Sequence, residues 1–341
     1  MREQKDFNPE LCHDLLLEKI KPSMAYNDDA DYNKWKRQLR EKFRELTGLD
    51  QIEQNACEPN FNIEWTEQKE GYSLTRFTFE SEVGETVPCY FLVPSTGKKK
   101  YPLAIALQGH SNGFHISIGE QKYENDVNSF PRGMHAIQAV ENGYAALAIE
   151  QRGMGERRPI SRNRHKDVKC TYAALTAIGL GRTILGERIW DISKAIDVVE
   201  QNFPVCDTSD TIITGGSGGG TASFYAACYD ERIKLCAPVC SFCSYKESIL
   251  SIAHCSCNYI PFSYKYFDMH DLAALIAPRK LAIVTGKLDE IFPINGVERS
   301  YEVVKKIYAR AGVPNNCSLS VTEEGHRWIN DIVWDAINKI K

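Results

Sequence analysis

The chain has 341 residues, of which 43% are hydrophobic and 25% are charged, as expected for a soluble protein with one large core. Its 41 basic and 45 acidic residues are spread along the whole chain, which argues against nucleic acid or an anionic membrane as a partner. No segment approaches the roughly 18 apolar residues that span a bilayer. Twelve cysteines are too few for a disulfide scaffold, so we expect a cytoplasmic protein with reduced thiols.

The first 70 residues predict a helical extension packed on the main domain. Apolar residues recur at helical spacing over 9–20 and again over 31–47, and the second pattern ends at Gly48. The remainder, 71–341, is expected to form one catalytic domain.

This domain predicts a mostly parallel sheet flanked by helices. It opens with two alternating segments around a turn at 82–85, which indicate an antiparallel hairpin at the sheet edge. Short apolar runs then alternate with helical patterns, as in a doubly wound α/β sheet. The apolar runs are 103–107, 144–149, 211–214, 235–239, 281–285 and 319–321, and the helical patterns are 133–142, 185–201, 221–228, 295–311 and 327–340.

Two stretches interrupt the alternation, at about 154–182 and 241–278. Each follows a predicted strand. Because ligands bind beyond the carboxyl ends of the strands in such a sheet, we expect both insertions to cover a pocket there.

The candidate nucleophile is Ser217. It lies in Gly-Gly-Ser-Gly-Gly (215–219), between a predicted strand and a predicted helix, which is the setting of a nucleophile elbow. Neither the dinucleotide-binding glycine frame nor the lysine of a phosphate-binding loop is present, so a nucleotide site is not indicated. We expect the Gly218 N–H, at the helix start, to stabilise an oxyanion.

A candidate acid and a candidate base follow Ser217 in the order typical of serine hydrolases on such a sheet. Asp289 comes after the strand at 281–285, and His326 comes after the last strand. His326 would accept the serine proton, and Asp289 would orient the imidazole. Glu290 is the competing acid.

His110 lies in the loop after the strand at 103–107, where a second oxyanion donor is expected. We assign that role to its backbone N–H.

Four cysteines in or directly before the second insertion, with a histidine between them, raise the alternative of a zinc site. Their second pair is separated by one residue, whereas structural zinc ligands usually stand two to four residues apart, so we expect buried thiols and no metal. The five residues are Cys240, Cys243, His254, Cys255 and Cys257.

With these residues placed, the chain from about residue 80 onward resembles the acetyl xylan esterase branch of the α/β hydrolases, near the dienelactone hydrolases. The resemblance rests on Gln-Gly-His at 108–110, Glu-Gln-Arg-Gly-Met-Gly at 150–155, Trp-Asp at 190–191 with Ala-Ile-Asp at 195–197, the elbow at 215–219, Ala-Pro-Arg at 277–279, Asp289 with Phe-Pro at 292–293, and Gly-His-Arg at 325–327.

The resemblance implies an α/β-hydrolase fold and deacetylation of sugars without a metal or organic cofactor. It also implies that Arg152 has a structural role, paired with Glu150 or Glu156. Typical members have His-Gly where this chain has Gln108-Gly109, and Gln where Gly218 and Met154 stand. None of these departures touches the serine, the acid or the histidine.

We therefore expect a serine esterase acting on a small-molecule or oligosaccharide ester; the sequence leaves the oligomeric state open. A serine peptidase or amidase, and a non-catalytic binding protein on the same scaffold, are the alternatives. The tyrosines at 245, 259, 264 and 266 are expected to offer aromatic surface to a sugar. The expected pocket residues are Gln108, Met154, Phe242, Tyr259 and Phe292.

Overall fold

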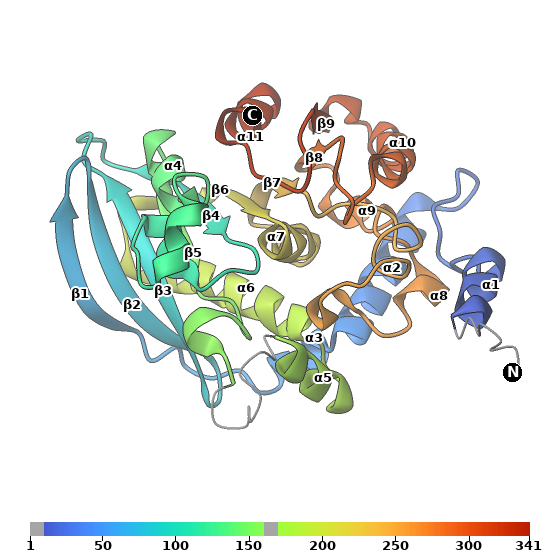
Figure 1. Cartoon of the computed structure of the whole chain (residues 1–341), viewed down its shortest axis with the longest axis horizontal. Coiled ribbons are helices and arrows are strands. Elements are labelled where there is room, and N and C mark those ends of the chain that lie inside the picture. The colour runs from blue at the N-terminus through green and yellow to red at the C-terminus, as the bar shows by residue number, and fades with distance from the viewer. Residues whose placement is uncertain (1–9, 160–169) are drawn as a thin grey trace, which may run out of the picture.

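The computed structural model describes residues 10–159 and 170–341, which form a nine-stranded sheet flanked by helices (Figure 1). The strand order across the sheet is β1-β2-β3-β5-β4-β6-β7-β8-β9. The strands are β1 Asn62–Lys69, β2 Tyr72–Glu82, β3 Glu85–Pro94, β4 Tyr101–Leu107, β5 Ala145–Ile149, β6 Cys206–Gly216, β7 Ile233–Val239, β8 Lys280–Gly286 and β9 Cys317–Thr322.

The six strands from β5 to β9 in this order are parallel, and β1, β2 and β3 extend the sheet as an antiparallel edge. The uniformly apolar runs of the sequence are the parallel strands, because helices cover both of their faces. In β5, for example, all five residues are buried. The predicted fold class is therefore confirmed.

The α-helices join the strands or extend the chain. They are α1 Leu11–Lys19, α2 Tyr32–Thr47, α3 Leu49–Glu53, α4 His135–Glu141, α5 Thr171–Gly179, α6 Ile184–Asn202, α7 Gly218–Tyr229, α8 Ser263–Tyr266, α9 Ala273–Ile276, α10 Ile294–Arg310 and α11 Asn330–Ile340. Short 3-10 helices are η1 Phe114–Ile118, η2 Glu124–Ser129, η3 Gly155–Arg157, η4 Ser256–Asn258 and η5 Pro314–Asn316.

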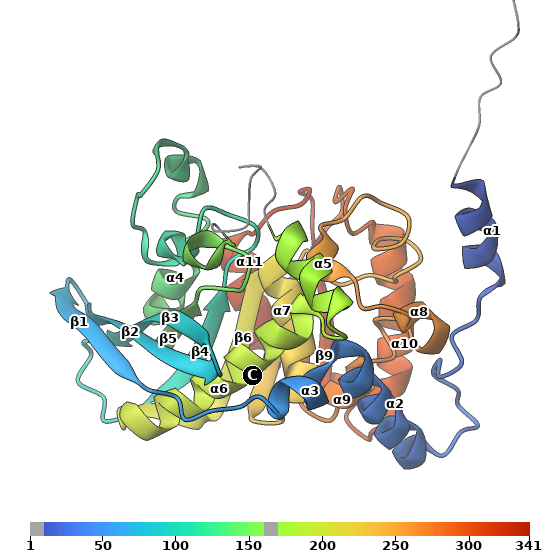
Figure 2. The same cartoon turned by 90° about the horizontal axis from the view of Figure 1, so that it is seen from below.

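A hydrophobic core lies on each face of the sheet. The larger one receives side chains from α2, α6, α7 and α10, and the smaller one receives side chains from α4 and α11. Figure 1 shows α4 and α11 on one side of the sheet, and Figure 2 shows α6 and α2 in front of it from below. Both layers hold the parallel strands in place, and with them the loops at their carboxyl ends.

The N-terminal helices differ in how they contact this domain. Helix α2 buries Trp35, Leu39 and Phe43 in the larger core, and Gly48 ends the helix in the left-handed conformation, with φ of 76°. Helix α1 buries no residue and lies at one end of the molecule (Figures 1 and 2).

Strand β1 was not expected from the sequence. Its apolar residues are Ile63 and Trp65 alone, and seven of its eight residues are exposed, so the alternation is too short to predict a strand. Its pairing with β2 is what orders it.

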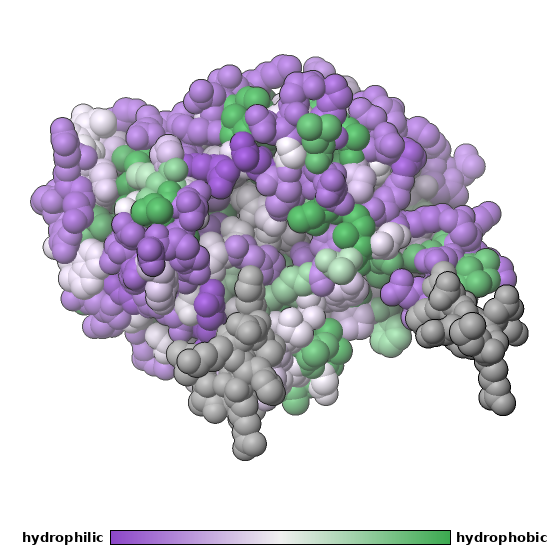
Figure 3. All heavy atoms as spheres, viewed as in Figure 1, coloured by the Kyte–Doolittle hydropathy of each residue, from purple (hydrophilic) through white to green (hydrophobic). Residues whose placement is uncertain are grey.

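The face of the molecule seen in Figure 3 is mostly hydrophilic, with hydrophobic residues in small separate groups. Among the described residues, no helix has the length and apolar character needed to cross a membrane.

Candidate active site

Ser217 occupies the sharp turn between β6 and α7. Its φ of 54° and ψ of -120° lie outside the regions that residues with a side chain usually adopt. The turn is fixed by the surrounding backbone: the Ser217 N–H donates to the Val239 carbonyl of the neighbouring strand at 2.9 Å, and the Ser217 carbonyl accepts from Thr221 N–H at 2.8 Å. Strain of this kind recurs at functional sites.

Two glycines of the elbow are required by close approach to the backbone of β4. A Cβ atom at Gly215 would lie 2.5 Å from the Leu107 carbonyl oxygen, and one at Gly219 would lie 2.4 Å from the same atom. Any side chain at either position would push α7 away from the sheet. The glycine-rich sequence therefore allows the helix to start directly beside the end of β4.

Asp289 and His326 meet at the carboxyl ends of β8 and β9. The His326 Nδ1 atom lies 2.8 Å from Asp289 Oδ2, and the Asp289 side chain is fully buried whereas that of His326 is 27% exposed. Glu290, the competing acid, is exposed. Of the two carboxylates, Asp289 is the one that contacts the imidazole.

The loop after β4 lies directly against the elbow. A Cβ atom at Gly109 would be 2.7 Å from the Gly216 carbonyl oxygen and 3.1 Å from Ser217 Cβ. The imidazole of His110 packs on the first turn of α7, 3.0 Å from the position of a Cβ at Gly218. As the first residue of a helix, Gly218 has no intrahelical acceptor for its N–H, and no described backbone carbonyl accepts from His110 N–H.

Two cavities that share lining residues lie at this end of the sheet, and the first of them opens beside Ser217. The first, about 230 Å³, is lined by both Ser217 and His326, together with Gly109, Trp328 and other residues of the surrounding loops. The second, about 530 Å³, shares His110, Ser111, Ile116, Ser129 and Arg132 with the first and is otherwise lined by Asn112, Asn125, Asn128, Gly153, Met154 and Arg158.

The expected pocket residues fall into different places. Gln108 lines the first cavity, although its Oε1 atom accepts from the Ser117 hydroxyl at 2.8 Å, and Met154 lines the second. Phe292 lines neither cavity, but its ring stacks on His326, with ring centroids 5.9 Å apart.

Phe242 and Tyr259 line neither of these cavities. Phe242 packs against Phe224 in the larger core, because the chain turns inward after β7. The tyrosines of the same insertion also pack against that core; Tyr245, for example, is buried with its hydroxyl 2.5 Å from that of Tyr225. These tyrosines were expected to offer an aromatic surface to a sugar. Among the described residues that line the two cavities there is no tyrosine.

Arg152 was expected to pair with Glu150 or Glu156, but the structure places it against other carboxylates. Its guanidinium forms a bidentate pair with Asp191, at 2.9 Å for both contacts, and a third contact with Glu82 at 2.7 Å. This buried cluster fixes the segment after β5 to β2 and α6.

Glu150, at the end of β5, instead supports the loop after β4. Its Oε2 atom accepts from the N–H of Phe114 and of Glu156, both at 3.2 Å. Burial raises the pKa of Glu150 to about 7, against the lowering effect of these two hydrogen bonds.

Residues 10–225, which are 216 of the 341 residues, match the model of the abhydrolase family. The chain belongs to the abhydrolase family. The matched segment includes the elbow and the loop after β4, but not Asp289 or His326.

Individual known proteins are also similar to this chain, in sequence or in fold. The chain is 27% identical over 247 residues, 71% of its length, to YtaP of Bacillus subtilis (strain 168), assigned as a hydrolase, and covers 78% of that protein. Its structure resembles that of an assigned acetyl xylan esterase from Bacteroides fragilis NCTC 9343, with a TM-score of 0.79, 18% identity, and 100% and 97% of the two chains covered. It also resembles the structure of a glucuronoyl esterase from Solibacter usitatus, with a TM-score of 0.66 and 15% identity. The match covers 95% of this chain and 98% of that one.

Two residues of this abhydrolase site were missed in the sequence. His135, at the start of α4, stacks on Trp328 with ring centroids 4.0 Å apart, and its Nδ1 donates to the Leu107 carbonyl at 3.2 Å. This contact holds the segment that follows His326 against β4. Nothing in the spacing of two residues 193 positions apart could have indicated it.

Cys240 is the second missed residue. In the sequence it was grouped with the other cysteines near the second insertion, and not with the acid and the histidine of the site. Its sulfur lies within 4.8 Å of ligand atoms of Asp289 and His326 and donates to the Arg327 carbonyl at 3.4 Å. Burial, followed by the charge of Asp289, raises the pKa of this thiol to about 12. It therefore stays protonated and packs beside the acid.

Proposed function

We propose that the chain is a serine-dependent carboxylic-ester hydrolase that deacetylates a carbohydrate or a similar small acetyl ester through an acyl-enzyme. The observation that carries this proposal is the common cavity of Ser217, at its strained turn, and His326, held at 2.8 Å by the buried Asp289. This is the combination of nucleophile, base and orienting carboxylate that acyl transfer requires.

In the first half-reaction, the Ser217 hydroxyl attacks the ester carbonyl while His326 Nε2 takes its proton. The imidazole then gives this proton to the departing alcohol, which leaves the acyl group on Ser217. The hydrogen bond from Nδ1 to Asp289 keeps Nε2 free to accept and stabilises the imidazolium.

In the second half-reaction, His326 activates water against the acyl carbonyl, and Ser217 leaves as the proton returns to it. Both tetrahedral intermediates carry an oxyanion. We assign its stabilisation to the N–H groups of Gly218 and His110, which lie on the two segments in contact beside the serine.

The two cavities support a small acyl group and a polar alcohol. The cavity at Ser217 is about 230 Å³, which is small for a ligand site. The adjoining cavity is lined by amide and guanidinium groups, from Asn112, Asn125, Asn128, Arg132 and Arg158. Such groups hydrogen-bond to hydroxyls, and the solved structures with a similar fold include carbohydrate esterases.

Kinetics of matched variants test this proposal. We expect Ser217→Ala and His326→Ala to lower kcat on an acetylated xylo-oligosaccharide and on nitrophenyl acetate by about ten-thousand-fold, with folding intact. Ser209→Ala and His13→Ala, at exposed positions, should retain full activity. Near wild-type rates in either site variant would exclude the mechanism.

The same experiment separates the alternative activities. A peptidase or amidase would cleave acyl-amino acid anilides as well as the matched esters, an esterase would cleave only the esters, and a binding protein on this scaffold would hydrolyse neither. Efficient cleavage of the anilides would favour the peptidase.

We also propose a cytoplasmic location. No disulfide joins any of the twelve cysteines, all of which belong to the described part of the chain, and this favours a reducing compartment.

A further inference from the structure

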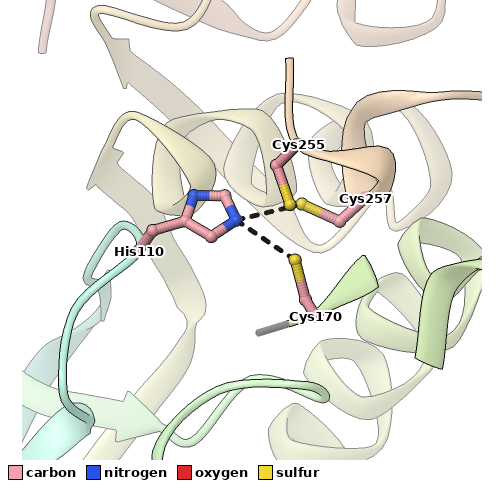
Figure 4. Close-up of side chains that lie close together, drawn as sticks. All are labelled: His110, Cys170, Cys255 and Cys257. Atoms are coloured by element: carbon pink, nitrogen blue, oxygen red, sulfur yellow. Dashed lines mark hydrogen bonds between the residues drawn. The ribbon is translucent and has the colours of Figure 1, made fainter. Parts of the chain in front are cut away.

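Four side chains of metal-binding type meet beside the loop after β4, and they come from three separate segments. His110 belongs to that loop, Cys170 precedes α5, and Cys255 and Cys257 lie at η4 in the second insertion. Their ligand atoms all lie within 4.8 Å of one another. Figure 4 shows the three sulfurs facing the same edge of the imidazole.

The two contacts that His110 makes within this cluster are close to the spacing of ligands around one ion. His110 Nε2 lies 3.2 Å from Cys257 Sγ and 3.4 Å from Cys170 Sγ. A ring nitrogen has either one proton or one lone pair, so it cannot bond well to both thiols at once. Zinc binds sulfur at about 2.3 Å and nitrogen at about 2.0 Å, which places tetrahedral ligands about 3.5 to 3.8 Å apart.

We propose that His110, Cys170, Cys255 and Cys257 bind one Zn²⁺ ion in a closed tetrahedral site. On binding, the three thiols release their protons to solvent and the imidazole Nε2 binds as a neutral base. Four protein ligands leave no position for water, so the ion stabilises structure and takes no part in the ester chemistry.

Burial and charge support the same assignment. Cys170 and Cys257 are buried, at 0% and 1% exposure. A Zn²⁺ ion with three thiolates carries one net negative charge, and the buried guanidinium of Arg188, which interacts with Cys257 and Cys170, supplies one positive charge. A buried charge of either sign is costly unless it is compensated.

The site would fasten both insertions to the candidate oxyanion loop. Cys170 holds the segment before α5, and Cys255 and Cys257 hold the second insertion. The imidazole of His110 also packs on the first turn of α7 at Gly218. The inference goes beyond the proposed hydrolysis, and metal binding can be measured whether or not the chain hydrolyses esters.

This grouping departs from the expectation of no metal. The sequence placed Cys255 and Cys257 with Cys240 and Cys243, which are the nearest cysteines along the chain. The structure separates them: Cys243 Sγ donates to the Pro293 carbonyl at 3.8 Å, and Cys240 lies at the catalytic acid.

Metal content tests the proposal directly. The full chain, produced with zinc in the medium and purified anaerobically with reductant and without chelator, should contain about one zinc per chain by elemental analysis. After chelation, added Co²⁺ should give the intense visible bands of a tetrahedral, thiolate-bound ion. Zinc-free wild-type protein, or a disulfide within the cluster detected by mass spectrometry, would overturn the proposal.

Two serine variants distinguish the structural grouping from the sequence grouping. Cys170→Ser should weaken zinc binding by more than about 100-fold in a competition titration with a chromophoric chelator, because it removes a ligand. Cys243→Ser, a buried cysteine outside the cluster, should bind zinc as wild type does. The reverse pattern would contradict the assignment, and if Cys170→Ser fails to fold, the zinc content and cobalt spectrum of the wild type still decide.

Discussion

The Oδ2 atom of Asp289 lies 2.8 Å from His326 Nδ1, while the other carboxylate oxygen accepts backbone hydrogen bonds from Ile291 at 2.8 Å and Phe292 at 3.0 Å. The carboxylate is thus fixed by its own loop and presents one oxygen to the histidine. The Phe292 ring covers the imidazole on one side. The loop after β8 therefore orients His326 through the hydrogen bond from Asp289 and through the ring of Phe292.

Replacing the acid separates the two candidate carboxylates. In Asp289→Asn, the side-chain oxygen would keep accepting from the backbone, so the amide NH₂ would face His326 Nδ1. The proton would then move to Nε2, which could no longer accept from Ser217, and we expect kcat to fall by about 1,000-fold or more. Glu290→Gln should change kcat less than about two-fold, because this side chain is exposed. The opposite ranking would move the acid to Glu290.

The small cavity at Ser217 predicts a preference for short acyl groups. Each methylene that fits an apolar pocket gains roughly 0.8 kcal/mol, so a roomy site would become more efficient as the acyl chain lengthens. We expect kcat/KM for nitrophenyl esters to fall from acetyl to butyryl and further to octanoyl. Equal efficiency for octanoyl and acetyl esters would contradict both the short pocket and the deacetylase assignment.

The adjoining polar cavity predicts a contribution to alcohol binding that simple esters do not use. Asn128 lines this cavity and not the one at Ser217. We expect Asn128→Ala to raise KM for an acetylated xylo-oligosaccharide by about 5- to 10-fold, the loss of one hydrogen bond, with nitrophenyl acetate unaffected. Asn33→Ala, on the exposed face of α2, is the matched control. Equal effects on both substrates would mean that Asn128 acts on the fold and not on the alcohol.

His135 predicts a specific pH dependence of stability. Burial lowers its pKa from 6.5 to about 4, although the hydrogen bond to the Leu107 carbonyl opposes this. Between these values the unfolded chain binds the proton and the folded chain does not. The stabilisation is therefore complete above pH 6.5 and is lost as the pH falls towards 4, by an amount of the order of 3 kcal/mol.

A substitution isolates this contribution. His135→Gln has no titrating group at this position, so the difference in unfolding free energy between wild type and variant should shrink by that amount from pH 7 to pH 4. Urea titrations at several pH values measure it. A difference that stays constant over this range would show that His135 is not buried in its neutral form.

Most of the fold follows from patterns that are local in the sequence. The apolar runs and helical periods between 101 and 341 predicted every parallel strand and the long helices, because burial on both faces imposes a distinct pattern on each element. Strand β1 has no such pattern. Its position depends on hydrogen bonds to β2, which single-sequence reasoning does not detect.

In the candidate site, too, some contacts could be predicted from the sequence and others could not. Ser217, Asp289 and His326 each follow a strand, so the order of strands alone indicated that they could meet. The course of an insertion has no comparable rule. Phe242 turned into the core, and the cysteines assembled with His110 and Cys170 from other segments, because packing and not sequence distance decides these contacts.

Labelling with a fluorophosphonate tests the central claim most directly, because only an activated serine reacts rapidly with it. Intact-mass and peptide analysis should show one adduct per chain, on Ser217, in parallel with the loss of esterase activity, and Ser217→Ala should remain unlabelled. An enzyme that hydrolyses esters yet stays unmodified at Ser217, or takes the label at another residue, would contradict the account.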